Sequence, residues 1–159
     1  MKKKTTLELL QQSERVSLYS ISFAADRTTE FERFMQKFEL EATVNKNYQK
    51  IIYAISLILE KGALERMFRP EGQYDDNLVA LPIESSNLRL YCLRISDEIL
   101  ILGNGGRKES EKYQDSPLLY GYAIDLQKFD RLLKKDIEDG IVTIEEKQLT
   151  GTQDVEYYI

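Results

Sequence analysis

A run of glycines followed by two cations is the stretch of this chain best suited to hold an anion. Gly103-Asn104-Gly105-Gly106 precedes Arg107 and Lys108. Successive backbone N–H groups in such a run can form a concave nest for an anion, and the adjacent cations would strengthen it. A flexible turn is the plain alternative for the same glycines. The segment therefore predicts a candidate anion site that includes Gly105, Gly106 and Lys108.

Arg89 is a further cation whose position suggests contact with phosphate. It lies within Leu88–Ile95, whose β-forming residues predict a strand. Its guanidinium could bind phosphate, or it could lie on the solvated face of an amphipathic strand. Because successive strand side chains point to opposite faces, Tyr91 is predicted to share the face of Arg89, with packing as its favoured role. Tyr113 could stack on a base or anchor the chain to the domain.

The composition restricts the chemistry that these residues could perform. The chain contains no histidine, which excludes imidazole acid–base chemistry and most zinc sites. An enzyme of this composition would depend on Arg, Lys, Glu, Asp, Tyr or the single cysteine. Cys92 lies in an apolar stretch and is predicted to be a small core residue. The acidic pairs of the chain occur without any other ligand pattern, so we expect neither a metal nor a cofactor.

The length and charge of the chain indicate one globular domain. It has 159 residues, of which 42% are hydrophobic and 31% are charged. The net charge of -5 disfavours indiscriminate binding to nucleic acid, although a local basic patch can exist on an acidic protein. The stretch after Lys2-Lys3-Lys4 is too polar for a signal peptide, and no apolar run approaches the roughly 20 residues of a membrane helix. We therefore expect a cytoplasmic protein with no contact to membrane.

Hydrophobic periodicity predicts two helices between strands. Thr29 and Glu32 have the spacing of a capping box, and apolar side chains then repeat at helical intervals from Phe31. Residues 1–13 are expected to form a short helix or a frayed arm, the glycine run to end the sheet, and the tail from Gly151 to be loose. The predicted helices are 29–40, 46–61 and 117–139, and the predicted strands are 16–23, 78–83, 88–95, 98–102 and 141–145. We expect a three- or four-stranded antiparallel sheet with the first two helices on one face.

This order of strand, two helices and strand meander resembles the RelE/ParE superfamily of type II toxin–antitoxin proteins. Arg89–Leu102 is similar to the family's central hairpin, and Gly105–Tyr113 resembles the RelE segment of glycine, basic pair, acidic–serine stretch and tyrosine. The resemblance spans roughly residues 16–116 and implies an α+β domain: an antiparallel β-sheet with an N-terminal strand, a two-helix hairpin and a strand meander. Residues 1–15 would then be an N-terminal arm, and residues 117–159 a C-terminal helical extension packed on the same domain.

RelE-type messenger-RNA interferases cut the codon in the ribosomal A site with basic residues and a tyrosine, without a metal. The resemblance implies a cognate antitoxin protein as partner, and the ribosome and messenger RNA as targets. It implies catalytic roles for Arg89, Arg107 and Tyr113, and RNA or anion contacts for Gly105, Gly106, Lys108 and Tyr91.

The chain departs from RelE on the strand before the arginine strand. RelE carries two lysines there, whereas this chain has no Lys or Arg between Arg69 and Arg89. Three functions therefore stay open. The chain could be a toxin-like protein that acts on ribosome-associated messenger RNA. It could be a catalytically degenerate or ParE-like protein that binds a protein partner without cleaving RNA. It could also be an unrelated α+β module of similar topology.

Overall fold

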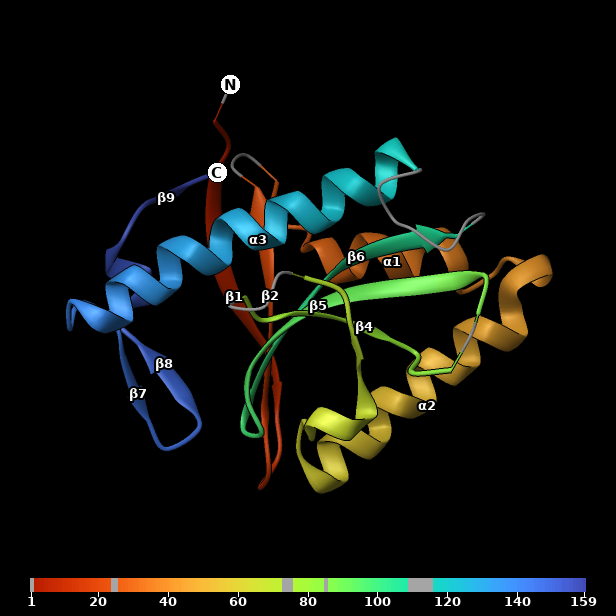
Figure 1. Ribbon diagram of the computed structural model, residues 1–159, viewed down its shortest axis with the longest axis horizontal. Helices are drawn as coiled ribbons and strands as arrows, with labels where there is room; N and C mark the ends of the chain where they lie inside the picture. Colours follow the sequence, from red (N-terminus) through yellow and green to blue (C-terminus); the bar gives the residue numbers. More distant parts are fainter. Residues whose placement is uncertain (1, 24–25, 73–75, 85, 109–115) are drawn as a thin grey trace.

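The computed structural model describes residues 2–23, 26–72, 76–84, 86–108 and 116–159. These ranges form a β-sheet with helices on both faces, which confirms the predicted α+β class (Figure 1). The helices are α1 (Glu30–Phe38), α2 (Asn45–Lys61) and α3 (Pro117–Glu138), with 3-10 turns at Ala42–Val44, Glu65–Met67 and Thr152–Asp154. The strands are β1 (Lys4–Gln12), β2 (Ser17–Phe23), β3 (Arg69–Pro70), β4 (Leu78–Leu81), β5 (Leu88–Ser96), β6 (Ile99–Arg107), β7 (Thr143–Glu145), β8 (Gln148–Thr150) and β9 (Tyr157–Tyr158).

The main sheet has the strand order β3-β4-β5-β6-β2-β1-β9 in the described residues. All neighbours are antiparallel except β2 and β6, which run parallel with Ser17 opposite Ile99. The strand predicted at 16–23 therefore pairs with the last strand of the meander. The sheet is larger than the three or four strands expected, because strands from both ends of the chain continue it beyond β2.

The expectation of a helix or frayed arm at the N-terminus is wrong, because residues 4–12 form β1. This strand pairs antiparallel with β2, and Thr5 lies opposite Phe23. The expectation of a loose tail is also wrong in the described structure. β9 pairs with β1, and the side chain of Tyr157 is buried. β1 pairs with β2 from Thr5 to Gln12 and with β9 at Lys4 and Thr5. This hydrogen bonding stabilises a strand that the sequence pattern did not indicate.

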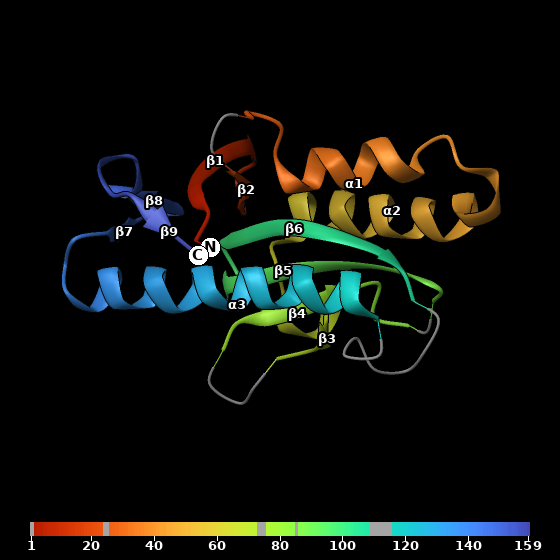
Figure 2. The same cartoon turned by 90° about the horizontal axis from the view of Figure 1, so that it is seen from above.

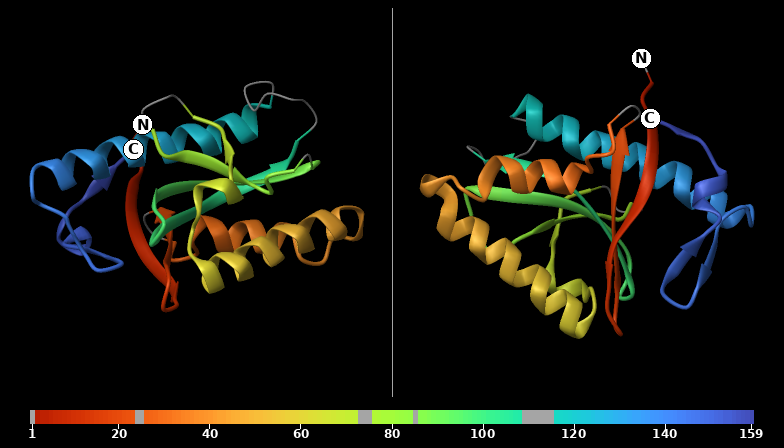
Figure 3. Two further views of the ribbon diagram at one scale, coloured as in Figure 1. Left: turned by 60° about the horizontal axis from the view of Figure 1, so that its bottom comes forward. Right: turned by 180° about the vertical axis from the view of Figure 1, so that it is seen from behind.

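The helices cover opposite faces of the sheet (Figures 2 and 3). α1 and α2 pack on one face, over a core that includes Phe34, Ile51 and Leu90. α3 packs on the other face, over a core that includes Tyr91 and Phe129. The 117–159 segment thus packs on the same sheet as the rest, and it contains the β7–β8 hairpin and β9 in addition to its helix.

The start of α1 has the local structure that its residues predict. The Thr29 hydroxyl accepts a hydrogen bond from the Glu32 N–H at 3.2 Å, and the Glu32 carboxylate accepts one from the Thr29 N–H at 3.1 Å. This reciprocal capping box satisfies two donors that a helix leaves free at its first turn. The helix is thereby directed along the sheet with Phe31, Phe34 and Phe38 buried.

β6 has a free edge along its second half. β2 pairs only with Ile99–Leu102 of β6, so no described strand lies beside residues 103–107 on that side. The glycine run continues β6 instead of ending the sheet, which corrects that expectation. Gly103 and Asn104 together lie opposite Tyr91, which makes a β-bulge in this strand. α1 and α3 approach this edge from the two faces of the sheet.

Candidate functional site

Arg89 lies on β5 and is buried by the tertiary structure. Its Nη1 donates to Oε1 of Glu71 at 2.8 Å, and the two side chains are only 3% and 9% exposed. Burial lowers the pKa of the Arg89 guanidinium, while the charge of Glu71 opposes that shift. Tyr91 lies two residues further on and is also buried, in the core beneath α3. Neither side chain is therefore presented to solvent.

Arg107 lies on the other face of the sheet from Arg89. Its register partner is Leu88, whereas Arg89 lies opposite Gly106. Directly opposed residues share a face, so Arg107 projects toward the α1–α2 side and Arg89 toward the α3 side. The guanidinium of Arg107 forms an ion pair with Glu41 and donates to Oγ1 of Thr43 at 2.7 Å. The two arginines therefore do not converge on one surface.

Of the remaining predicted site residues, the structure describes Lys108 but not Tyr113. The Lys108 N–H donates to the Asn87 carbonyl at 2.7 Å, which extends the pairing of β5 and β6 by one hydrogen bond. Tyr113 lies outside the described residues.

The glycines of β6 are required by close packing. A Cβ on Gly105 would overlap the carbonyl oxygen of Arg89 on the neighbouring strand. A Cβ on Gly106 would lie 3.1 Å from Cδ2 of Leu119 on α3. Close approach of two layers is thus sufficient to explain small residues here.

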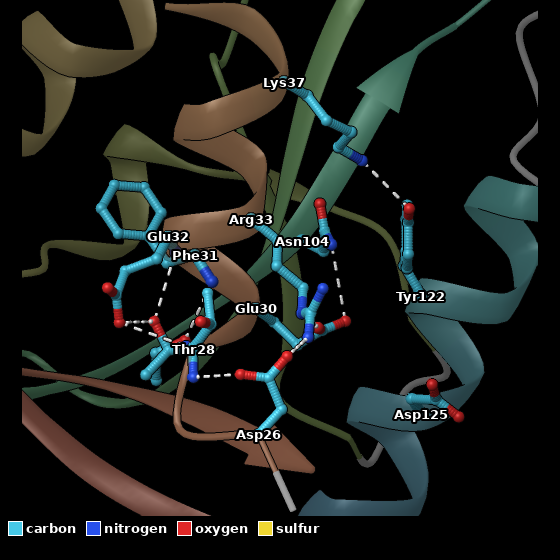
Figure 4. Close-up of polar contacts among 12 residues, drawn as sticks. Asp26, Thr28, Glu30, Phe31, Glu32, Arg33, Lys37, Asn104, Tyr122 and Asp125 are labelled. Atoms are coloured by element: carbon cyan, nitrogen blue, oxygen red, sulfur yellow. Dashed lines mark hydrogen bonds and ion pairs between the residues drawn. The ribbon is translucent and has the colours of Figure 1, made fainter.

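A polar cluster that the sequence analysis did not identify closes the free edge of β6 (Figure 4). Lys37 of α1 and Tyr122 of α3 point toward one another, and Nζ of Lys37 lies 3.0 Å from the Tyr122 hydroxyl. The same Nζ donates to the Gly105 carbonyl at 2.9 Å. Nδ2 of Asn104 lies 3.5 Å from Oε1 of Glu30. We call this set the β6-edge cluster: Glu30, Arg33, Lys37, Asn104 and Tyr122.

Enclosure between the layers shifts the titration of three members of the β6-edge cluster. Burial raises the pKa of Glu30, which the hydrogen bond from Asn104 and the charge of Arg33 partly oppose. Burial lowers the pKa of Lys37, against the charge of Glu30. Burial also raises the pKa of Tyr122. A lysine of lowered pKa beside a tyrosine is a pair that could transfer protons.

The contacts of the β6-edge cluster nevertheless indicate a structural role, because they join α1 and α3 to the edge of β6. Nε of Arg33 lies 3.5 Å from Glu30, and Arg33 also forms an ion pair with Asp26. The Lys37 ammonium satisfies a free edge carbonyl, which is a common protection of exposed strand edges. Asp26 and Glu30 offset the charge of Arg33, so the cluster does not form the basic surface that a polyanion requires.

One sequence signal could have located the β6-edge cluster. Glu30, Arg33 and Lys37 occur at i, i+3 and i+7, which places them on one face of α1 beside the phenylalanine face. Their partners on β6 and α3 could not be found this way, because Tyr122 follows Lys37 by 85 residues.

An apolar hollow lies on the outer side of α2. We call it the α2 groove, and its volume is about 230 Å³. Tyr53 is 65% exposed and Ile83 is 48% exposed at its margin. The groove is lined by Lys50, Tyr53, Ala54, Leu57, Met67, Pro82, Ile83 and Glu84.

Comparison with family models, with curated proteins and with solved structures yields no match to this chain. In the described ranges, no group of three or more His, Cys, Asp or Glu side chains is placed to hold a metal ion. None of the described helices has the length and apolar character needed to cross a membrane.

Proposed function

We propose that this chain is a RelE/ParE-like member of a toxin–antitoxin pair that binds its protein partner without cleaving RNA. The element order supports this proposal, since β2 precedes two helices on one face and pairs with the following strand meander. That layout agrees with what the resemblance of Arg89–Leu102 and Gly105–Tyr113 to the family implies.

The burial of Arg89 and the ion pair of Arg107 favour protein binding over RNA cleavage. Arg89 is buried against Glu71, and Arg107 is paired with Glu41 on the opposite face. For Arg89 to bind a phosphate, it would have to leave Glu71 as a buried charge without a partner. Such an arrangement costs about 3–5 kcal/mol, which opposes use of this arginine in catalysis.

The observation that carries the proposal is the α2 groove. Isolated exposed apolar residues are ordinary, but Tyr53 and Ile83 flank a hollow whose lining also includes Leu57 and Met67. A large aromatic beside a preformed apolar hollow is a common anchor point in protein interfaces.

The charges around the α2 groove favour an acidic partner. Lys46, Lys50, Tyr53, Leu57 and Lys61 follow one another at intervals of three or four residues, so they form one stripe along α2. In the part of the chain that the structure describes, none of these three lysines forms an ion pair within 4.0 Å. We therefore propose an amphipathic helix as the bound segment, with apolar residues in the groove and acidic residues along the lysines.

The proposal predicts that a small antitoxin protein is encoded next to this chain, and the test uses that protein. The two proteins are co-expressed and purified, and their complex is measured by light scattering and titration calorimetry. We expect a stable complex that buries roughly 1,000 Å² or more. Replacing both Tyr53 and Ile83 with Ala should weaken binding about tenfold or more, because anchor residues each contribute over about 1 kcal/mol.

Leu40→Ala is the matched control, since Leu40 is highly exposed and lies outside the α2 groove. It should bind as the wild type does. Equal binding by the Tyr53→Ala, Ile83→Ala protein would disprove the groove as the binding surface. Arrest of cell-free translation with cut messenger RNA, caused by the purified chain and lost in Arg107→Ala, would instead establish RNA cleavage.

A further inference from the structure

A second hollow lies where α3 meets the two ends of the described chain, which Figure 1 marks beside one another. The Lys3 N–H donates to the Ile159 carbonyl at 2.6 Å, and the Ile159 N–H donates to the Lys3 carbonyl at 2.9 Å. These bonds hold the residue before Lys3 next to β9. We call this hollow the basic depression; it has a volume of about 320 Å³ and is lined by Lys2, Lys128, Arg131, Leu132, Tyr158 and Ile159.

The three cations of the basic depression have no acidic partners among the described residues. Within the described ranges, none of Lys2, Lys128 and Arg131 forms an ion pair within 4.0 Å. Their neighbours behave differently, because Lys3 pairs with Asp125 at 2.7 Å and Lys4 pairs with Glu156 at 3.4 Å. The carboxylates of Asp125 and Glu156 thus pair with cations beside the depression. The three cations of the depression itself keep their charges without an ion pair among the described residues.

The lining of the basic depression also differs from that of two other hollows. The α2 groove contains Glu84 besides Lys50. A polar hollow beside the β1–β2 hairpin contains Glu8 and Asp26 besides its cations. Among the described residues, the lining of the basic depression contains three cations and no Asp or Glu side chain. A concave surface of one sign focuses the electrostatic potential and attracts counter-ions, even on a protein of net charge -5.

Lys128 and Arg131 are placed to act on one ligand. They are three residues apart on α3, so their side chains project from the same side of the helix. Tyr158 adds an aromatic ring that is 45% exposed, and its hydroxyl donates to Glu156 at 3.0 Å. That bond anchors the tip of the side chain and leaves a ring face to stack on a base.

We propose that the basic depression binds a nucleoside polyphosphate. Three cations offset most of the negative charge of a triphosphate, and Tyr158 offers a surface for the base. The volume lies at the lower end of the roughly 300–1,000 Å³ of small-molecule sites. A compact ligand fits better than a nucleic-acid strand, because three cations in one small hollow can contact only a short run of phosphates.

The experiment is a calorimetric titration of the full chain at low ionic strength with adenosine triphosphate and with inorganic tripolyphosphate. Both ligands should bind. The nucleotide should bind about fivefold or more tightly than tripolyphosphate, because a stacked base adds to the charge contacts. Tyr158→Ala should abolish that difference and leave tripolyphosphate binding unchanged. The double variant Lys128→Ala, Arg131→Ala should weaken binding of both ligands about tenfold or more.

Lys135→Ala is the matched control, because Lys135 lies on the same helix but pairs with Asp139 at 3.4 Å. It should bind both ligands as the wild type does, and thermal melting should show that all variants are folded. Absence of saturable binding by both ligands would overturn the proposal, and so would equal losses in the control and in the double variant. Tighter binding of a single-stranded RNA oligonucleotide, in competition with the nucleotide, would overturn the assignment to a compact ligand. The result is independent of the α2 groove, which lies on the other side of the sheet.

Discussion

Near the start of β5, the guanidinium of Arg89 and the carboxylate of Glu71 are buried together. A buried ion pair adds little net stability when intact, because desolvation offsets the attraction. Removal of one partner is costly, since the other charge stays buried. In this structure Arg89 is therefore the partner that neutralises buried Glu71, which lies in the segment that follows β3.

Replacing Arg89 with Ala should lower the free energy of unfolding by about 3–5 kcal/mol, because Glu71 would stay buried without its partner. Urea denaturation measures the loss. Lys135→Ala removes a cation from an exposed ion pair and should cost less than about 1 kcal/mol. Equal losses in the two variants would mean that Arg89 is accessible to solvent, and would restore it as a candidate for contact with phosphate.

At the scale of elements, the second half of β6 is shaped by its glycines. Gly105 allows the backbones of β5 and β6 to approach, and Gly106 allows α3 to lie close to the sheet. Gly121 of α3 provides the contrast, because a Cβ at that position would meet nothing within 4 Å. Replacement by alanine should therefore lower the stability of the protein at Gly105 and raise it at Gly121.

Gly105→Ala should destabilise the protein by about 1–3 kcal/mol, because backbone must move to admit the methyl group. Gly121→Ala should raise stability by about 0.5–1 kcal/mol, since alanine loses less entropy than glycine in a helix. The midpoints of urea unfolding report both changes. A Gly105→Ala protein as stable as the wild type would show that packing does not require this glycine, and would leave a backbone anion nest as its explanation.

At the scale of the whole molecule, the β6-edge cluster is a place where the helices of opposite faces meet. Lys37 and Tyr122 join α1 to α3 past the free edge of β6, and Glu30 is buried beneath them. Burial raises the pKa of Glu30 above its ordinary 4.5, against the opposing effects of Asn104 and Arg33. Between pH 4.5 and the raised pKa, the folded protein therefore binds more protons than the unfolded chain. Its free energy of unfolding should fall as the pH rises through this range.

Glu30→Gln should remove this contribution. Relative to the wild type, the variant should gain stability as the pH is raised from about 4 to about 8, as measured by urea unfolding at each pH. Glu60→Gln, on the exposed side of α2, is the control for replacing a glutamate outside the β6-edge cluster. Lys37 affects stability in a separate, alkaline pH range. Because its pKa is lowered, the free energy of unfolding should rise as the pH increases toward 10.5, the ordinary pKa of lysine. Parallel profiles for Glu30→Gln and the wild type would contradict the burial of this carboxylate.

The sequence by itself determined the features that depend on local backbone geometry. The spacing of Thr29 and Glu32 predicted the capping box, and helical periodicity predicted the buried phenylalanine face of α1. The hairpin of β5 and β6 followed from two β-forming runs around a tight turn, and the apolar surroundings of Cys92 predicted its complete burial. Each of these features depends on residues that are close together in the sequence.

Only the tertiary structure decided the register of the paired strands and the partners of individual strands and side chains. Pairing of Leu88 with Arg107 placed Arg107 and Arg89 on opposite faces, and this register depends on a bulge that the glycine run could not specify. Tyr158 lies far from Lys4 in sequence, yet their strands pair and turn both ends of the chain into sheet. Such contacts form because buried backbone groups and charges must find partners wherever the fold brings them, and periodicity along one segment contains no information about that choice.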